Sequence, residues 1–351
     1  MMNPQEALSR WNSTDPVHEA PDNGLINRTW LVGEPPWAVL QWVNPIFDPM
    51  IHYDIEAVTA RLEESGLTSP RLLPTAAGKL WADLGSDCWR LMTFIPGKTL
   101  HRIENPRQAA EAGRVAGCFH RALQGWDYER KARRRHIHDT TMHMSELHAA
   151  CAESTGHPLA AEAGELGADI LRRWSDWDGE MPRRQRFCHG DLKISNLRFE
   201  ARDGFGESAE GAESNDEGIC LIDLDTLGPM PIACEMGDAW RSWCNPAGED
   251  DPEAVAFDTE LFAASARAWL AVAPPLDEDE KQSLVPGIER ICLELAARFC
   301  ADALRNSYFR EDRQRYPEIG THNLIRARSQ SALAESARRA REECEAIVMS
   351  A

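Results

Sequence analysis

The period of the hydrophobic positions changes along the chain, and the largest change falls near residue 95. The stretches GLINRTWLVG (24–33) and WAVLQWVN (37–44) are rich in β-branched and aromatic residues, and the Gly-Glu-Pro-Pro turn between them predicts a hairpin. The next apolar positions recur at helical spacing: Ile51, Ile55, Val58 and Leu62. Two further strand candidates, 79–84 and 88–95, follow this helix. These elements predict a small α+β lobe.

After residue 95 the apolar positions follow a helical period. Two stripes show it most clearly: Ala112, Ala116, Phe119 and Leu123, and later Ile288, Cys292, Leu295 and Phe299. We therefore divide the chain into an N-terminal lobe, residues 1–95, and a mainly helical C-terminal lobe, residues 96–351. Residues 1–20 are polar and irregular, which predicts a loosely held leader. The stretch 201–218 is poor in apolar residues and rich in Gly, Ser and Glu, which predicts a flexible surface insertion. The alternative, a Ca²⁺-binding loop, is disfavoured because the acidic residues do not alternate as such a loop requires.

Composition excludes several classes of protein. No apolar run is long enough to span a bilayer, and the start lacks the apolar core of a signal peptide. The ten cysteines form no Cys-x-x-Cys pair, which favours reduced thiols in a cytoplasmic protein. A net charge of −19 argues against nucleic acid or an anionic membrane as a partner. The basic run 129–136 is interpreted as a solvated loop.

The candidate chemistry lies in FCHGDLKISN (187–196) and CLIDLDT (220–226). Phosphoryl transfer needs a carboxylate that orients the acceptor hydroxyl, oxygen ligands for Mg²⁺ and cations near the transferred group. Asp191 is the candidate for the first role, and Lys193 is placed to reach the γ-phosphate. Asn196 follows Asp191 at the spacing of the kinase catalytic loop, and Asp223 ends an apolar strand, so both are candidate metal ligands.

Each of these features also has an ordinary structural explanation. Asp191 alone could cap a turn, and Asp223 alone could be a strand-end carboxylate. Their order, after a small α+β lobe and inside a helical one, favours the kinase-like interpretation.

The chain resembles the aminoglycoside phosphotransferase family, whose catalytic loop begins His-Gly-Asp, as at 189–191. Within that family it is most similar to the N-acetylhexosamine 1-kinase branch. The matching segments are GLINRTWLV, VLQWVNP, PRLLPT, LIDLDTLGPMP, GDAWRSW and the late RFCADAL and HNLIRARSQ. The resemblance implies a bilobal, protein-kinase-like α+β fold with ATP between the lobes.

The resemblance also implies where ATP is held. Residues 24–27 take the place of the loop that covers the phosphates, and residues 92–94 that of the hinge whose backbone groups contact adenine. The implied cofactor-binding residues are Gly24, Ile26, Asn27, Gln41, Met92 and Phe94.

One position departs from the kinase pattern. Gln41 stands where a strand lysine usually contacts the α- and β-phosphates and pairs with a helix glutamate. Either another cation replaces this lysine, with Arg28 and Arg90 as candidates, or a neutral Gln is sufficient, or catalysis is weakened. Glu56, on the following helix, would then lack its usual partner.

The remaining implied site residues support the loop or contact the acceptor. His189 and Asp238 would hold the catalytic loop in shape, although Asp238 could equally be a helix N-cap. Asp225 is either a second metal-side carboxylate or a support of its loop. The implied acceptor-binding residues are Trp240, Arg298, Asp302 and Tyr308, each of which could equally be a packing or surface residue.

Three functions follow as hypotheses. The first is an ATP-dependent kinase of a sugar hydroxyl, such as the anomeric hydroxyl of an N-acetylhexosamine. The second is a kinase of an aminoglycoside or another amino alcohol, which the acidic charge would suit. The third is a nucleotide-binding pseudokinase, which only the missing strand lysine favours.

Overall fold

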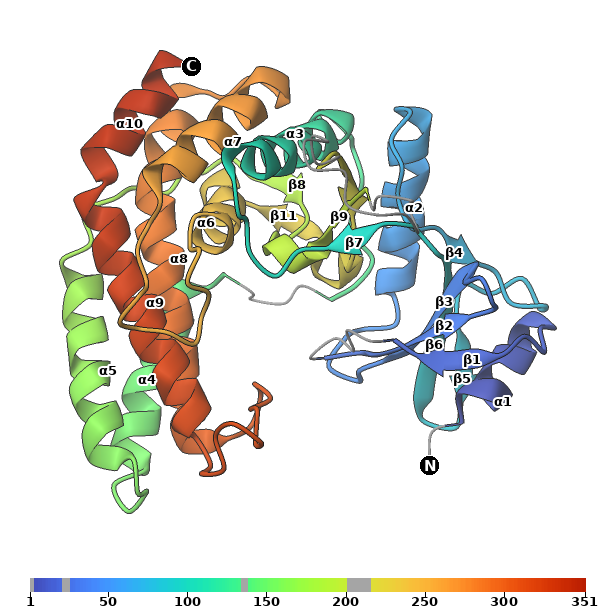
Figure 1. Ribbon diagram of the computed structural model, residues 1–351, viewed down its shortest axis with the longest axis horizontal. Helices are drawn as coiled ribbons and strands as arrows, with labels where there is room; N and C mark the ends of the chain where they lie inside the picture. Colours follow the sequence, from blue (N-terminus) through green and yellow to red (C-terminus); the bar gives the residue numbers. More distant parts are fainter. Residues whose placement is uncertain (1–2, 21–25, 134–137, 201–215) are drawn as a thin grey trace, which may run out of the picture.

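The computed structural model describes residues 3–20, 26–133, 138–200 and 216–351. Two lobes lie side by side in it: a sheet with few helices, and a larger body made mostly of helices (Figure 1). Strand β6 (Asp87–Thr93) belongs to the sheet of the small lobe, whereas β7 (Lys98–Thr99) already pairs with a strand of the large lobe. The chain thus passes between the lobes within a few residues of position 95.

The small lobe is built on an antiparallel sheet with strand order β1-β2-β3-β6-β4, and β5 pairs with β6. Its other strands are β1 (Val17–Glu19), β2 (Arg28–Val32), β3 (Ala38–Val43), β4 (Leu72–Leu73) and β5 (Ala82–Leu84). The predicted hairpin is formed by β2 and β3, which pair directly across their turn. The predicted strand 79–84 is shorter than expected, because only its last three residues join the sheet.

Residues 3–20 are not a loose leader, so the prediction was wrong for this described part of the segment. Residues Pro4–Leu8 form helix α1, Ser9–Trp11 a 3₁₀ turn, and β1 is the edge strand of the sheet. Ala7 and Leu8 are fully buried against the sheet, and the Trp11 indole donates to the carbonyl of Leu73 at 2.7 Å. Two apolar residues are too few to show a helical period, which explains why the pattern missed them.

Helix α2 (Ile51–Glu64) lies between the lobes (Figure 1). The predicted stripe is buried, but it belongs to the hydrophobic cluster of the large lobe and not to that of the sheet. Asp54 anchors the helix to the same lobe, because it accepts hydrogen bonds from Tyr128 Oη at 2.8 Å and from the backbone N–H of Lys131 at 2.7 Å. The first part of the basic run 129–136 therefore contacts α2 through the backbone of Lys131.

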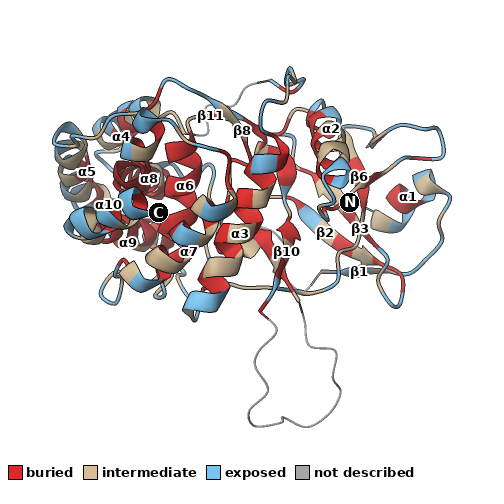
Figure 2. Cartoon of the chain, turned by 90° about the horizontal axis from the view of Figure 1, so that it is seen from above, coloured by how far each residue is buried: buried red, intermediate tan, exposed pale blue. Residues whose placement is uncertain are grey.

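The large lobe is a set of packed helices around α6 and α8, which are the most buried (Figure 2). Its helices are α3 (Pro106–Ala122), α4 (Thr140–Glu153), α5 (Ala160–Ser175), α6 (Ile232–Trp243), α7 (Thr259–Val272), α8 (Glu278–Arg305), α9 (Thr321–Arg339) and α10 (Arg341–Ser350). Glycines let α6 and α8 approach closely: a Cβ on Gly237 would lie 2.6 Å from the carbonyl oxygen of Gly287. This contact fixes the depth of α6 beneath the catalytic loop. Within the described residues, no helix is long and apolar enough to cross a membrane.

Short strands of the large lobe carry the two motif loops. The strands are β8 (Arg186–Cys188), β9 (Leu197–Phe199), β10 (Gly218–Leu221) and β11 (Gly228–Met230). The predicted flexible insertion lies at 201–215 outside the described residues. Its last three residues are ordered, since Asp216 is buried, accepts a hydrogen bond from Lys98 at 3.2 Å, and Gly218 begins β10.

Candidate active site

Two antiparallel strand pairs bring the predicted motifs together. The loop of Asp191 connects β8 to β9, the loop of Asp223 connects β10 to β11, and β8 pairs with β11 while β9 pairs with β10. Backbone contacts join the loops, because Ile222 N donates to the carbonyl of Asn196 at 2.8 Å. His189 Nε2 lies 2.9 Å from the carbonyl of Ile222. His189 was expected to support the catalytic loop, and this contact joins that loop to the Asp223 loop.

Asp191 lies at the centre of the catalytic loop. Its Oδ2 accepts from Lys193 Nζ at 2.6 Å and from Asn196 Nδ2 at 3.0 Å. Burial opposes ionisation of Asp191, but Lys193 outweighs it and holds the pKa of the carboxyl below its ordinary value. Asp191 is therefore a carboxylate that can orient a hydroxyl through Oδ1, since its contacts with described residues use Oδ2.

Asp223 has an unusual backbone conformation, with φ 64° and ψ 61°. This left-handed region is uncommon for residues other than glycine and is often seen at functional sites. Asp223 forms no ion pair with any described residue, although it shares its surroundings with Asp225 and Asp191. The pKa of Asp223 is raised to about 6, first because the surrounding loop limits the hydration of its carboxylate and second because these two carboxylates lie close to it. The residue as a whole is exposed. An unpaired carboxylate among like charges is a site that a cation would stabilise.

Gly190 explains the His-Gly-Asp sequence in steric terms. Its φ is +86°, and a Cβ at this position would lie 2.5 Å from the carbonyl oxygen of Thr226. Thr226 Oγ1 in turn donates to the carbonyl of His189 at 2.8 Å. The two loops are thus in direct contact, and only glycine fits between them.

Helix α6 holds the catalytic loop from below. Glu235 accepts from the backbone N–H of His189 at 2.7 Å and of Gly190 at 2.8 Å. Ser242 Oγ accepts from Ile194 N at 3.0 Å, and the Trp243 indole donates to the carbonyl of Leu192 at 2.7 Å. The loop therefore has its shape fixed by side chains of one helix.

Asp238 does not make the predicted hydrogen bond to the catalytic loop. Its Oδ1 accepts from Arg241, at 2.9 Å from one terminal nitrogen, and its buried Oδ2 has no hydrogen-bond partner among the described residues. The prediction was wrong because sequence alone does not show which acidic residue of α6 faces the loop. The side chain that does so is Glu235.

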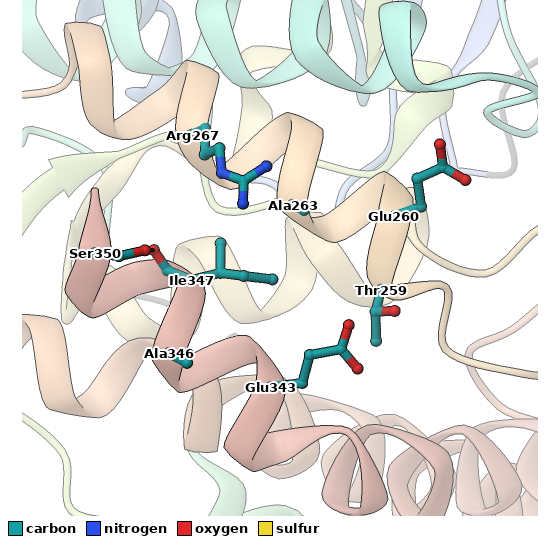
Figure 3. Close-up of a pocket in the computed structure, with 8 residues that line it drawn as sticks. All are labelled: Thr259, Glu260, Ala263, Arg267, Glu343, Ala346, Ile347 and Ser350. Atoms are coloured by element: carbon teal, nitrogen blue, oxygen red, sulfur yellow. Dashed lines mark hydrogen bonds between the residues drawn. The ribbon is translucent and has the colours of Figure 1, made fainter.

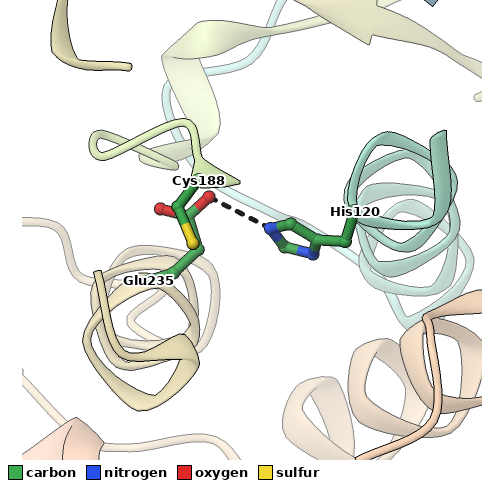
Figure 4. A group of neighbouring side chains, drawn as sticks. All are labelled: His120, Cys188 and Glu235. Carbon is green, nitrogen blue, oxygen red and sulfur yellow. Dashed lines mark hydrogen bonds and ion pairs between the residues drawn. The ribbon is translucent and has the colours of Figure 1, made fainter. Parts of the chain in front are cut away.

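Beneath the loop, His120, Cys188 and Glu235 form a buried cluster of potential metal ligands (Figure 4). Each is already engaged in hydrogen bonds. The Trp269 indole N–H donates to His120 Nδ1 at 3.0 Å, so His120 must carry its proton on Nε2, which lies 3.1 Å from Glu235 Oε1. Burial raises the pKa of the Cys188 thiol well above its ordinary value, which disfavours the thiolate that a metal requires. We interpret the cluster as a support of the catalytic loop.

On the nucleotide side, the structure shows three of the predicted positions in a polar network. Gly24 lies outside the described residues, and the carbonyl of Ile26 accepts from Asn44 Nδ2 at 3.3 Å. Asn27 is buried and donates through Nδ2 to Asp225 Oδ2 at 2.6 Å. Gln41 Oε1 accepts from Arg90 Nε at 2.8 Å, so its amide faces a guanidinium.

The predicted hinge follows the sheet closely. Met92 is buried in β6, where it pairs with β3 and β4. The N–H of Phe94 donates to the carbonyl of Trp37 at 3.0 Å, so it is already used within the small lobe. The adenine contacts of Met92 and Phe94 stay a prediction.

The four predicted acceptor-binding residues are not equivalent. Trp240 is fully buried and packs edge-on against Phe262 and Trp269, so it belongs to the core and not to an acceptor pocket. Asp302 is a local cap: its carboxylate accepts from the backbone N–H of Tyr308 at 2.9 Å and of two neighbouring residues.

Arg298 and Tyr308 do lie together. The guanidinium of Arg298 lies 5.7 Å from the Tyr308 ring centroid, and 5.4 Å from that of Phe309.

Sequence reasoning missed a buried polar group between α8 and the start of α4. Glu294 on α8 accepts from Thr140 Oγ1 at 2.6 Å and lies 3.0 Å from His138 Nδ1. Burial opposes protonation of His138, but Glu294 outweighs it and raises the pKa of the imidazole. A glutamate inside an apolar helical stripe was the available signal, since such a residue is rarely buried without a partner.

One open pocket of the described residues lies away from the catalytic loop. It measures about 440 Å³ between α7 and α10 and is lined by residues such as Arg267, Glu343 and Ile347 (Figure 3). None of the catalytic-loop residues lines it.

Fold and site together define a class of protein: a kinase-like phosphotransferase, in which the carboxylates of Asp191 and Asp223 lie on two joined loops. The sequence pattern of the phosphotransferase enzyme family matches residues 18–275, so the chain belongs to that family. Membership of this family makes it a small-molecule phosphotransferase.

Solved structures confirm the predicted protein-kinase-like fold. A microcompartment-associated aminopropanol kinase is 18% identical, with 97% of each chain covered and a TM-score of 0.62. An aminoglycoside phosphotransferase from Alicyclobacillus acidocaldarius is 15% identical, with 98% of this chain and 97% of that chain covered and a TM-score of 0.60. An amicoumacin kinase, solved with AMP-PNP and Ca²⁺, is 10% identical, with coverages of 90% and 89% and a TM-score of 0.57.

Proposed function

We propose that this protein is an ATP-dependent sugar kinase that uses Mg²⁺ and phosphorylates the anomeric hydroxyl of an N-acetylhexosamine. The observation that carries phosphoryl transfer is the joined arrangement of Asp191, Asn196 and Asp223. This intact set also opposes the pseudokinase hypothesis, whose only motive was the missing strand lysine. The sugar acceptor is supported by the charge balance around the catalytic loop and by the branch-like segments of the sequence.

The residues of the chain have distinct roles in this reaction. The acceptor oxygen attacks the γ-phosphorus, the bond to the bridging oxygen of ADP breaks, and the hydroxyl proton passes to Asp191. The lowered pKa of Asp191 makes it a weak base, so its main role is to orient the hydroxyl until the proton becomes acidic late in the transfer. Lys193, held 2.6 Å from Asp191, places a positive charge beside the transferring group.

The donor set fits a hard divalent cation. Asp223 provides an unpaired carboxylate, and Asn196 directs Nδ2 to Asp191, which leaves its amide oxygen as a ligand atom. Oxygen ligands of this kind suit Mg²⁺. When bound, the cation would supply charge neutralisation for the phosphate oxygens.

Two carboxylates near the loop, Asp238 and Glu249, are paired with arginines, which favours a neutral acceptor. Arg241, which contributes to the low pKa of Asp191, lies 2.9 Å from Asp238 and 3.0 Å from Glu249. Arg326 lies 2.7 Å from the same Glu249. Two carboxylates are thus matched by two guanidinium groups. A polycationic aminoglycoside would be better recognised by unpaired carboxylates.

Two unpaired polar atoms support a hydroxylated ligand. Asp238 Oδ2 and His138 Nε2 are buried and have no hydrogen-bond partner among the described residues. The negative charge of Asp238 helps to raise the pKa of His138 and also that of Lys193. A sugar hydroxyl could donate to Asp238 Oδ2 and accept from His138 Nε2.

The aromatic side chains nearby do not form a free cage for a quaternary ammonium. Arg298 lies over Tyr308 and Phe309, and Arg326 lies 3.9 Å from the ring centroid of Phe299. Cations of the protein already occupy these ring faces. This argues against choline as the acceptor.

The experiment is ADP release from Mg-ATP over a panel of acceptors. N-acetylhexosamines should give turnover, with loss of the reducing end, whereas aminoglycosides, aminopropanol, ethanolamine and choline should give little. Asp191→Asn is the control and should lower the rate by about 10²–10⁴-fold while ATP binding is retained. Turnover confined to an amino alcohol would overturn the acceptor assignment, and unchanged turnover in Asp191→Asn would overturn the role of Asp191.

A further inference from the structure

Gln41 and its neighbour Arg90 occupy the place of the usual strand lysine. The two residues are directly paired across β3 and β6. Gln41 Oε1 accepts from Arg90 Nε at 2.8 Å, and Gln41 Nε2 donates to Thr29 Oγ1 at 3.1 Å. Both ends of the Gln41 amide are therefore engaged within the sheet, and its carbonyl orients the guanidinium.

Arg90 extends from this position to the other lobe. Both of its terminal nitrogens bind Asp225, with Nη2 2.9 Å from Oδ2 and Nη1 in contact with Oδ1. The two side chains are each only 1% exposed. This is the planar two-point geometry in which arginine binds a carboxylate most specifically. Asp225 lies two residues after Asp223, so this ion pair connects the small-lobe sheet to the Asp223 loop.

Asn27 completes the connection from the strand β2 side. Its Nδ2 donates to Asp225 Oδ2 at 2.6 Å, and its Oδ1 accepts from Asn44 N at 2.9 Å. Three donors therefore surround the Asp225 carboxylate. Oxygens bound in this way favour the supporting role of Asp225 over the metal-side role that the sequence also left open.

The usual lysine–glutamate pair has no counterpart here. Glu56 on α2 instead lies 3.1 Å from Arg71, which precedes β4. Helix α2 is fixed to the large lobe through Asp54 and does not need a strand lysine to hold it. The connection between sheet and catalytic centre runs through Arg90.

We propose that Arg90 is a positioning residue, and that the Arg90–Asp225 pair replaces the strand lysine–helix glutamate pair by holding the small lobe against the Asp223 loop. Arg90 acts through Asp225, because a side chain with 1% exposure has no surface for the nucleotide. The inference rests on phosphoryl transfer at Asp191 but not on the identity of the acceptor.

Gln41→Lys separates this proposal from the alternative that the chain merely lacks its lysine. A lysine would place a second cation against Arg90, so we expect slower turnover and weaker protection of the Asp223 loop. If position 41 only lacked a lysine that binds phosphate, the turnover of Gln41→Lys would be faster than that of the natural chain, and that result would overturn the proposal. Gln41→Met, which removes the hydrogen bonds without adding charge, should have a smaller effect than Gln41→Lys.

Arg90 itself is tested with three variants. Arg90→Met should lower kcat for ATP hydrolysis without an acceptor by about 10–100-fold, a typical effect of losing an orienting partner, with a smaller change in KM for ATP. Arg90→Lys should recover part of this loss. Arg71→Met is the matched control, because its pair with Glu56 is partly exposed and does not include Asp225.

A second readout does not depend on turnover. Hydrogen exchange of the ligand-free protein should show faster exchange at residues 222–227 in Arg90→Met and Gln41→Lys, and no change in Arg71→Met. Where Arg90→Met does not fold, the double variant Arg90→Met with Asp225→Leu removes both buried charges and should fold while kcat stays low. Full kcat with unchanged exchange in any folded Arg90 variant would overturn the proposal. Failure of the sugar panel would leave these measurements unaffected.

Discussion

Glu235 is the residue whose replacement should separate loop geometry from the chemistry of the reacting groups. It is fully buried beneath the catalytic loop and accepts three hydrogen bonds, from the N–H groups of His189 and Gly190 and from His120. In Glu235→Gln the amide keeps the shape of the side chain. Its NH₂ group, however, must face at least one of these donors, so one donor loses its acceptor.

The expected cost can be worked from these contacts. A hydrogen bond to a charged acceptor contributes roughly 1.5–3 kcal/mol, and the bonds that remain to Glu235→Gln become neutral and weaker. We expect the free energy of unfolding to fall by about 2–4 kcal/mol. For a lobe of this size that corresponds to a Tm lower by about 5–15 °C. Displacement of Gly190 beside Asp191 should also lower kcat by about 10–100-fold.

The assays are thermal unfolding and ADP release at neutral pH. The low pKa of Glu235 reflects burial, which opposes ionisation, outweighed by the His120 hydrogen bond, so its stabilisation is present above about pH 4.5 and is lost only as the pH falls further. Glu153→Gln is the matched control, because its pair with Arg305 is exposed and should contribute little. A Glu235→Gln protein with the Tm and kcat of this control would refute the reasoning.

Three further outcomes follow from the site. Because the pKa of Asp223 is raised to about 6, activity should fall as the pH drops through that value. Added Mg²⁺ should move this acidic limb of the pH–rate profile to lower pH. An acidic limb that does not depend on Mg²⁺ would contradict the assignment of Asp223 as a metal ligand. Gly190→Ala should lower kcat and stability, since its Cβ would meet Thr226, and an active, stable variant would refute the steric argument. EDTA treatment of the nucleotide-free protein should leave Tm unchanged, whereas a lower Tm would identify the His120–Cys188–Glu235 cluster as a metal site.

The part of the site that the sequence predicted is the part that is local in the chain. Asp191 and Asn196 are five residues apart, so one loop brings them together whatever the rest of the fold does. Asp223 could be added because a strand ending in a carboxylate, placed in the right order, has few arrangements available. The division into two lobes was predictable for a similar reason, since the largest change of the hydrophobic period falls at one place, near residue 95.

The part that could not be predicted depends on contacts between distant residues. Arg90 and Asp225 are 135 residues apart, and Asn27 and Asp225 are 198 apart. The sequence offered Arg28 and Arg90 as candidate cations. Nothing in the pattern around Gln41, however, indicates that Arg90 is its cross-strand partner or that Arg90 binds Asp225. Trp240 failed for another reason: α6 is buried on almost all sides, so its sequence does not distinguish a residue that faces a ligand from one that faces the core.

Helix α6 is a case in which the predicted segment contacts the catalytic loop, but through residues other than the predicted one. The segment was expected to hold the catalytic loop through Asp238, but Glu235 and Ser242, two turns apart and therefore on one face, make the contacts. Asp238 lies on the same helix yet pairs with Arg241, which also faces Glu249. The loop-holding function and the charge-balancing function are thus assigned to different positions of one helix. It follows that Asp238→Asn should affect acceptor binding more than loop geometry, whereas Glu235→Gln should do the reverse.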